Sequence, residues 1–166
     1  PAGIEYAQVR TASEMQAATL KACQQADVLL MAAAVADFRP EQTSKHKIKK
    51  TGGTPVLKVA PNPDILASIH RQRQEMGTPQ IVVGFAAESQ DLLANAKTKL
   101  EAKGLDMIAA NNIAALDAGF AVDTNRVTLI HANGQQEELP LMSKKQVAAT
   151  IVARVASMLN EEIDHE

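Results

Sequence analysis

The sequence predicts an α/β fold with three layers: a mostly parallel, Rossmann-like sheet with a carboxy-terminal β-hairpin and a final helix. Continuous apolar runs alternate with segments of helical periodicity, which is typical of parallel strands covered by helices. Asn133-Gly134 then separates strand-like segments at residues 126–132 and 135–139, and this dipeptide is a strong hairpin signal. The length of 166 residues, without an internal repeat or a shift in composition, indicates a single domain over residues 1–166.

The first helix and the first strand are marked by a cap and by an apolar run. Thr11 and Glu14 form a capping box, and the helix that they begin is expected to run to about residue 25. The apolar run at residues 28–33 predicts a buried strand. Residues 37–55 are polar, basic and glycine-bearing, and we expect a long mobile loop there.

Caps and glycines also mark the later elements. Asn62 and Pro63 favour a helix start, because Asn caps helices and Pro suits the first helical position. Gly104 ends the helix that precedes it, and Ser143 with Gln146 forms a second capping box before the final helix. The elements expected between the loop and the hairpin are a strand at residues 56–59, a helix at 64–73, a strand at 81–86, a helix at 91–103 and a strand at 107–110.

The composition excludes several classes of protein. With 17 basic and 19 acidic residues the formal net charge is -2, which argues against a general nucleic-acid binder. No apolar run approaches the ~20 residues of a membrane span, and no signal peptide opens the chain, so no membrane association is expected. Cys23 is the only cysteine and forms no internal disulfide, which indicates a reduced, cytoplasmic protein with Cys23 as a small core residue.

Polar and aromatic residues lie at or just beyond the carboxyl ends of the predicted strands, where ligands bind in open α/β sheets. Asp37 could hold a ribose hydroxyl or a metal-bound phosphate, or it could simply cap a loop. Phe85 could stack on a base, although core packing is its ordinary role. Asn62-Pro63-Asp64 begins a helix whose free N–H groups suit an anion or a base carbonyl, with a plain helix start as the alternative.

Two groups of lysines are candidates for phosphate contacts. The only basic cluster, at residues 45–50, could close over a triphosphate, and a solvated charge run is the alternative. Lys99 and Lys103 are four residues apart and share one helix face, so an anion between them would relieve their repulsion. Exposed lysine pairs are nevertheless common.

Several motifs are missing from the sequence. It contains no GxGxxG and no Walker lysine loop, so an ordinary dinucleotide or P-loop site is absent. The four histidines match no zinc spacing, and no serine stands in a nucleophile elbow. The residues by themselves support a nucleotide-phosphate site without specifying a reaction.

A combination of motifs resembles a known family over nearly the whole chain, in order and with the family's spacing. The motifs are Ala32-Ala33-Ala34-Val35-Ala36-Asp37-Phe38, Lys47-Ile48-Lys49-Lys50, Asn62-Pro63-Asp64-Ile65-Leu66, Val83-Gly84-Phe85-Ala86-Ala87-Glu88, Lys99 and Lys103, Leu105-Asp106-Met107-Ile108 with Ala110-Asn111, and Gly119-Phe120 with Asp123 and Asn125. Together they resemble phosphopantothenoylcysteine synthetase, the carboxy-terminal half of the bacterial bifunctional decarboxylase/synthetase of coenzyme A biosynthesis.

The resemblance implies a CTP-dependent ligase, dimeric as in the family, that joins 4'-phosphopantothenate to cysteine through an acyl-cytidylate, with Mg²⁺ on the phosphates. It implies that Lys47 promotes formation of the acyl-cytidylate and that Asp37 is a metal or sugar contact. The matching CTP contacts are Met31, Ala32, Ala33, Asp37, Lys47, Pro63, Asp64, Ile65, Leu66, Phe85, Lys99 and Lys103.

The sequence also departs from the family pattern. The family domain begins with a strand, a glycine- and serine-rich phosphate turn and a catalytic asparagine, and Pro1 aligns after that segment. We therefore expect an amino-terminally truncated synthetase domain that supplies most of the CTP site, with the decarboxylase half fused or associated and no FMN in this portion. The alternative is a catalytically inactive module for nucleotide binding or dimerisation. A generic Rossmann-like cofactor binder is disfavoured by the missing glycine fingerprint.

Overall fold

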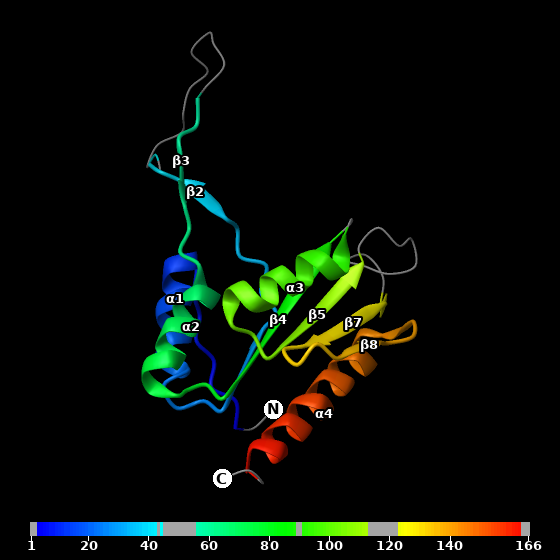
Figure 1. The fold of residues 1–166 in the computed structure, drawn as a ribbon. Helices are drawn as coiled ribbons and strands as arrows, with labels where there is room; N and C mark the ends of the chain where they lie inside the picture. The colour runs from blue at the N-terminus through cyan, green and yellow to red at the C-terminus, as the bar shows by residue number, and fades with distance from the viewer. Residues whose placement is uncertain (1–2, 43, 45–55, 89–90, 113–122, 164–166) are drawn as a thin grey trace.

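A computed structural model describes residues 3–42, 44, 56–88, 91–112 and 123–163, and it has the three-layer α/β architecture that the sequence predicts (Figure 1). The described helices are α1 (Ala12–Ala22), α2 (Ile65–Met76), α3 (Leu92–Lys103) and α4 (Lys144–Ile163). The described strands are β1 (Val28–Met31), β2 (Phe38–Pro40), β3 (Val59–Pro61), β4 (Ile81–Glu88), β5 (Met107–Asn112), β6 (Thr124–Asn125), β7 (Val127–His131), β8 (Gln136–Glu138) and β9 (Met142–Ser143).

The central sheet has five strands in the described part of the chain, in the order β1-β4-β5-β7-β8. β1 pairs in parallel with β4, with Val28 opposite Ile81, and β4 pairs in parallel with β5. β7 is antiparallel to β5, and β8 is antiparallel to β7. Of these described strands only β7 therefore runs in the opposite direction, which confirms the prediction of a mostly parallel sheet.

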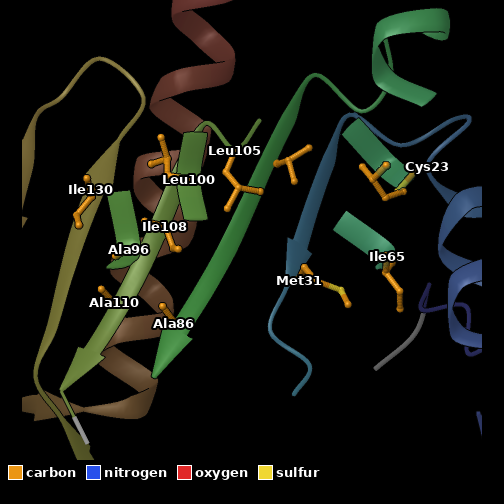
Figure 2. Packing of buried hydrophobic residues seen from close by; sticks show 12 residues of the cluster. Cys23, Met31, Ile65, Ala86, Ala96, Leu100, Leu105, Ile108, Ala110 and Ile130 are labelled. Carbon is orange, nitrogen blue, oxygen red and sulfur yellow. The ribbon is translucent and has the colours of Figure 1, made fainter. Parts of the chain in front are cut away.

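Two buried clusters occupy the two faces of the sheet, because successive strand residues point to opposite sides. Val82 and Ile108 belong to the cluster beneath α2 and α3, which Figure 2 shows together with Cys23 at the end of α1. Val83 and Met107 belong to the other cluster, which packs against α4. The layers are thus α1, α2 and α3, then the sheet, then α4.

The caps that the sequence predicts are present. Thr11 and Glu14 form the capping box of α1, and the Ser143 hydroxyl accepts the Gln146 N–H at 3.3 Å at the start of α4. Gly104 ends α3 in the left-handed conformation with a φ of 58°. The β7–β8 hairpin forms around Asn133 and Gly134, as predicted.

The segment expected to be a loop at residues 37–55 contains a strand. β2 pairs antiparallel with β3, so Phe38 lies opposite Pro61 in a short ribbon apart from the main sheet (Figure 1). The expected strand at residues 56–59 begins only at Val59. Prolines in both short strands weaken any sequence signal, because proline donates no hydrogen bond to a sheet. Residues 45–55 of the predicted loop lie outside the described residues.

Other boundaries also differ from the prediction, and β4 and β5 each extend two residues beyond the expected end. α1 ends at Ala22 rather than near residue 25, because the N–H groups of Gln24 and Gln25 bond to carbonyls three residues earlier instead of four. β1 ends at Met31, so the alanines that follow it leave the sheet. α2 continues to Met76 and ends at Gly77 in the left-handed conformation. No helix in the described ranges is long and apolar enough to cross a membrane.

Candidate functional site

A cavity of about 250 Å³ lies at the carboxyl end of β1, between the β1–β2 connection and the start of α2. It is named the Asp37 cavity below. Its lining residues are Met31, Ala33, Val35, Ala36, Asp37, Asn62, Pro63, Asp64, Ile65 and Leu66. The structure therefore brings together most of the residues that the sequence singles out, although they come from two segments about 25 residues apart.

Asn62 joins the two walls of this cavity. Its side-chain Nδ2 donates to the Ala36 carbonyl at 2.8 Å, and its backbone N–H donates to the Asp37 carbonyl at 2.7 Å. Arg39 of β2 donates to the Asn62 Oδ1 at 3.2 Å and also to the Pro61 carbonyl. Asn62 is therefore a brace for the loop that carries Asp37, and not the helix cap that its sequence context suggests.

The N-cap of α2 is Asp64, which corrects the prediction of a helix that starts from Asn62 and Pro63. Asp64 has an extended backbone, and its Oδ1 accepts the Ala67 N–H at 2.9 Å. The Oδ1 of Asn62 already accepts a hydrogen bond from Arg39, so the carboxylate of Asp64 takes the capping role.

Asp64 also pairs with Lys103 at the carboxyl end of α3. Burial raises the pKa of the Asp64 carboxyl, but hydrogen bonds from Lys103 and Ala67 and the lysine charge outweigh this, so its pKa lies below the ordinary value. Lys103 thus reaches the wall of the Asp37 cavity. Lys99 lies one turn earlier on the exposed surface of α3 and lines neither this cavity nor the groove described next.

A second hollow lies on the α4 face of the same sheet edge and is named the α4-face groove. It consists of two adjoining parts that share Ala32, Phe85, Asn125, Val147 and Ile151. The Phe85 side chain is 38% exposed, so Phe85 is not a core residue. Ala33 lines both the groove and the Asp37 cavity, which makes the two hollows neighbours across β1.

Asn111 lines the groove with an unusual polar atom. Its Oδ1 is buried and has no hydrogen-bond partner among the described residues. A buried acceptor without a partner is costly, so this oxygen suits a donor on a bound molecule. The sequence places Asn111 in a motif of the family resemblance but gives it no role, because the signal for this role is its burial.

The roles expected for Lys47 and for a magnesium ion are not fully covered by the described residues. Lys47 and Gly119-Phe120 lie outside the described residues. No group of three or more His, Cys, Asp or Glu side chains in the described ranges could hold a metal ion. Asp37 lines the cavity, whereas both carboxylate oxygens of Asp64 already accept hydrogen bonds, so one carboxylate remains for a magnesium ion that phosphate oxygens already hold.

The fold is that of a Rossmann-like α/β domain, with two hollows at the carboxyl end of its parallel strands as the candidate site. The family model "DNA/pantothenate metabolism flavoprotein C-terminal domain" matches residues 1–159. The chain belongs to this family, which confirms the resemblance seen in the sequence.

Individual relatives agree with this assignment. The chain is 41% identical over 159 residues to the coenzyme A biosynthesis bifunctional protein CoaBC of Bacillus subtilis, covering 95% of the chain and 38% of that protein. It is 39% identical over 166 residues to the protein of the same name from Mycobacterium bovis, covering 96% of the chain and 40% of that protein. The chain therefore spans about two fifths of these relatives.

A solved structure shows the same fold. The crystal structure of the C-terminal domain of the coenzyme A biosynthesis bifunctional protein CoaBC superposes with a TM-score of 0.76 at 32% sequence identity. The match covers 97% of this chain and 69% of that domain. The similarity thus extends over the elements that build both the Asp37 cavity and the α4-face groove.

Proposed function

We propose that this chain supplies most of the CTP site of a phosphopantothenate–cysteine ligase in coenzyme A biosynthesis. The observation that carries the proposal is the Asp37 cavity, in which residues from the Asp37 and Asn62-Pro63-Asp64 motifs meet at the carboxyl end of β1. The names of the relatives support coenzyme A biosynthesis as the pathway. The chemistry of the cavity supports a nucleotide.

Different residues of the cavity and the adjoining groove would contact the ribose, the phosphates and the base of the nucleotide. The Asp37 carboxylate accepts hydrogen bonds from ribose hydroxyls or contacts a magnesium ion on the phosphates, and the small side chain of Ala33 permits close approach to the backbone. Lys103 brings a positive charge to the same wall through Asp64. Phe85 on β4 lines the adjoining groove and is 38% exposed, so its ring is available to the base. Magnesium, when bound, withdraws charge from the phosphate oxygens.

The proposed reaction has two steps. The carboxylate of 4'-phosphopantothenate attacks the α-phosphorus of CTP, forming a P–O bond and releasing pyrophosphate. The amine of cysteine then attacks the acyl carbon, the C–O bond to the phosphate breaks, CMP leaves, and the amine loses its extra proton. Lys47 would stabilise the charge that develops on the α-phosphate, and a single charge of this kind contributes roughly 3–4 kcal/mol.

The α4-face groove fits the acyl substrate. It is largely apolar, it adjoins the Asp37 cavity at Ala33, and it contains the Oδ1 of Asn111, which has no hydrogen-bond partner in the described part of the chain. The pantothenate arm combines aliphatic carbons with amide and hydroxyl donors, so it matches both properties of the groove. Its carboxylate end would then point toward the α-phosphate across β1.

The edge of β1 favours a second candidate, an inactive module for nucleotide binding or dimerisation. Among the described strands β1 pairs with β4 only, and Leu30 on β1 is 42% exposed. A strand from a longer protein or from a second copy could pair there. In that case the chain would bind nucleotide, and turnover would require the added segment.

Binding is tested by a thermal-shift titration of the chain with CTP, ATP, GTP and UTP, each with Mg²⁺. Ligand at about 100 times its dissociation constant adds roughly 2.7 kcal/mol, which for this size corresponds to a rise in Tm of roughly 5–11 °C. We expect this rise with CTP alone. Equal responses to all four nucleotides would contradict CTP selectivity, and a flat response to all four would contradict the site.

Turnover is tested by pyrophosphate release from CTP with 4'-phosphopantothenate and cysteine. The assay compares the chain with a longer protein that includes the preceding part of the synthetase domain. Release only by the longer protein would support the binding-module alternative for the chain. Lys47→Gln in the longer protein should abolish acyl-cytidylate formation, and unchanged release would remove Lys47 from the mechanism. Sedimentation of both proteins tests the proposed homodimer.

A further inference from the structure

Asp64 uses its two carboxylate oxygens for different purposes. Oδ1 accepts the Ala67 N–H at 2.9 Å and begins α2, whereas Oδ2 accepts a hydrogen bond from the ammonium of Lys103. One side chain thereby connects the amino end of α2 to the carboxyl end of α3. Because Asp64 also lines the Asp37 cavity, this connection fixes a cation at the wall of the cavity.

A cation near the cavity is important because the charged residues that line the cavity are acidic. The lining includes the carboxylates of Asp37 and Asp64, and none of the described lining residues is a cation. An anionic ligand would meet net repulsion from these walls without a compensating charge. Two described cations contact lining residues: Arg39 donates to the Oδ1 of Asn62, and Lys103 forms an ion pair with the carboxylate of Asp64.

Lys103 keeps the capacity to bind a ligand while it is paired. An ammonium group has three N–H donors, and Asp64 accepts one of them. The Lys103 side chain is 28% exposed, so the protein covers it only in part. A lysine that moves freely loses rotamer freedom when it binds an anion, whereas a tethered lysine has lost that freedom already.

We propose that Asp64 is a positioning residue, which holds the ammonium of Lys103 at the Asp37 cavity and leaves it donors for an anionic group of the ligand. This inference rests on the proposed function, because it assumes that the cavity binds a nucleotide. It assigns Asp64 an action through Lys103. A contact of Asp64 with the ligand itself is not required.

The test is a double-mutant cycle with Asp64→Asn, Lys103→Met and the double variant. Asparagine caps helices as well as aspartate does, so Asp64→Asn removes the charge and preserves the start of α2. Isothermal calorimetry measures binding of CTP with Mg²⁺ and, separately, of inorganic triphosphate. We expect Asp64→Asn to weaken both ligands roughly fivefold, in keeping with a partly exposed ion pair. The double variant should bind no more weakly than Lys103→Met.

A purely structural role gives a different pattern. Loss of the cap in Asp64→Ala would lower Tm without a dependence on residue 103, and Asp64→Asn would then bind like the wild type. In the longer protein, positioning should raise the KM for CTP more than it lowers kcat. Glu137→Gln serves as the matched control, since it breaks a comparable ion pair with Arg154 far from the cavity.

The outcomes separate this inference from the proposed function. If the wild type binds CTP and Asp64→Asn binds it equally well or more tightly, the positioning role is overturned and the nucleotide site stands. Additive losses in the double variant also overturn it, because the two residues would then act independently. If the wild type binds neither CTP nor inorganic triphosphate, both proposals fail.

Discussion

Arg73 and Asp106 form a bidentate ion pair at the amino ends of β4 and β5. Arg73 Nη1 lies 2.8 Å from Asp106 Oδ2, and Arg73 Nη2 lies 3.0 Å from Asp106 Oδ1. The Val82 N–H donates to the same Oδ2 at 2.7 Å, and Arg73 also donates to the carbonyls of Gln80 and Gly104. The pair therefore fixes the carboxyl end of α2 to the amino ends of two strands. The candidate site lies at the other end of these strands.

Asp106→Ala should destabilise the fold. The substitution leaves the Arg73 guanidinium without its counter-charge and the Val82 N–H without its acceptor, while both side chains of the pair are less than a quarter exposed. Lost hydrogen bonds to a charged group cost roughly 1.5–3 kcal/mol, so Tm should fall by roughly 3–12 °C. Thermal unfolding followed by circular dichroism measures this. Glu137→Gln, at an exposed pair, should change Tm much less, and equal losses would contradict the special role of Asp106.

Two features of position 104 require glycine: the left-handed backbone, and the lack of room for a Cβ beside the His70 ring. Its φ is 58°, and a Cβ at this position would lie 2.0 Å from Nδ1 of His70. Gly104→Ala should therefore cost about 1–2 kcal/mol for the left-handed backbone and more for the collision. Urea unfolding measures the loss. Gly134→Ala is the matched control, because its φ is 88° but nothing lies within 4 Å of the added Cβ.

The collision at Gly104 has its own check. His70→Ala removes the ring that the new methyl group would meet, so Gly104→Ala combined with His70→Ala should lose less stability than the sum of the two single changes. A strictly additive double variant would show that only the backbone conformation matters at this position.

Asn62→Ala should weaken nucleotide binding through the Asp37 loop. The change removes the Nδ2 donor to the Ala36 carbonyl and the Oδ1 acceptor for Arg39, so the wall that carries Asp37 loses its brace. Two net hydrogen bonds at about 1 kcal/mol each correspond to a loss of roughly 30-fold in CTP affinity. Calorimetry measures this, with Asn160→Ala on the exposed side of α4 as the control. Unchanged affinity would show that the loop holds its shape without Asn62.

The architecture could be predicted from the sequence because its signals are local. The apolar runs, the capping box at Thr11 and the Asn133-Gly134 turn each act over a few neighbouring residues, and the structure contains all three features. The β2–β3 ribbon could not be predicted in this way. Its pairing joins Phe38 to Pro61 across 23 residues, and its strands are too short for a periodic pattern.

The candidate site was predictable in its residues but not in its contacts. The motifs around Asp37 and Asp64 are contiguous in the sequence, and the rule for open α/β sheets places them at one edge. The roles of Asn62 as a brace and of Asp64 as a cap depend on which hydrogen-bond partner each side chain reaches in space. The burial of the Asn111 Oδ1 likewise arises only from packing of the groove.

The lowered pKa of Asp64 has a consequence for stability at acid pH. A carboxyl whose pKa is lower in the folded chain than in the unfolded chain adds stability above its unfolded pKa, and loses that contribution as the pH falls through the folded value. Asp64 titrates below its ordinary value of 3.8, and hydrogen bonding to Arg154 likewise lowers the pKa of Glu137 below 4.5. The chain should therefore lose stability from both groups as the pH falls below about 5.

Lys103→Met isolates the contribution of Asp64 to this pH dependence. The wild type should be more stable than the variant at pH 6–7 and low salt, because the ion pair is intact there, and the difference should shrink as Asp64 gains its proton. Urea unfolding at a series of pH values between about 7 and 3 measures both curves. Added salt should reduce the difference at neutral pH, since the pair is partly exposed. A difference that stayed constant down to pH 3 would show that Lys103 stabilises α3 by packing, and that its pairing with Asp64 contributes nothing.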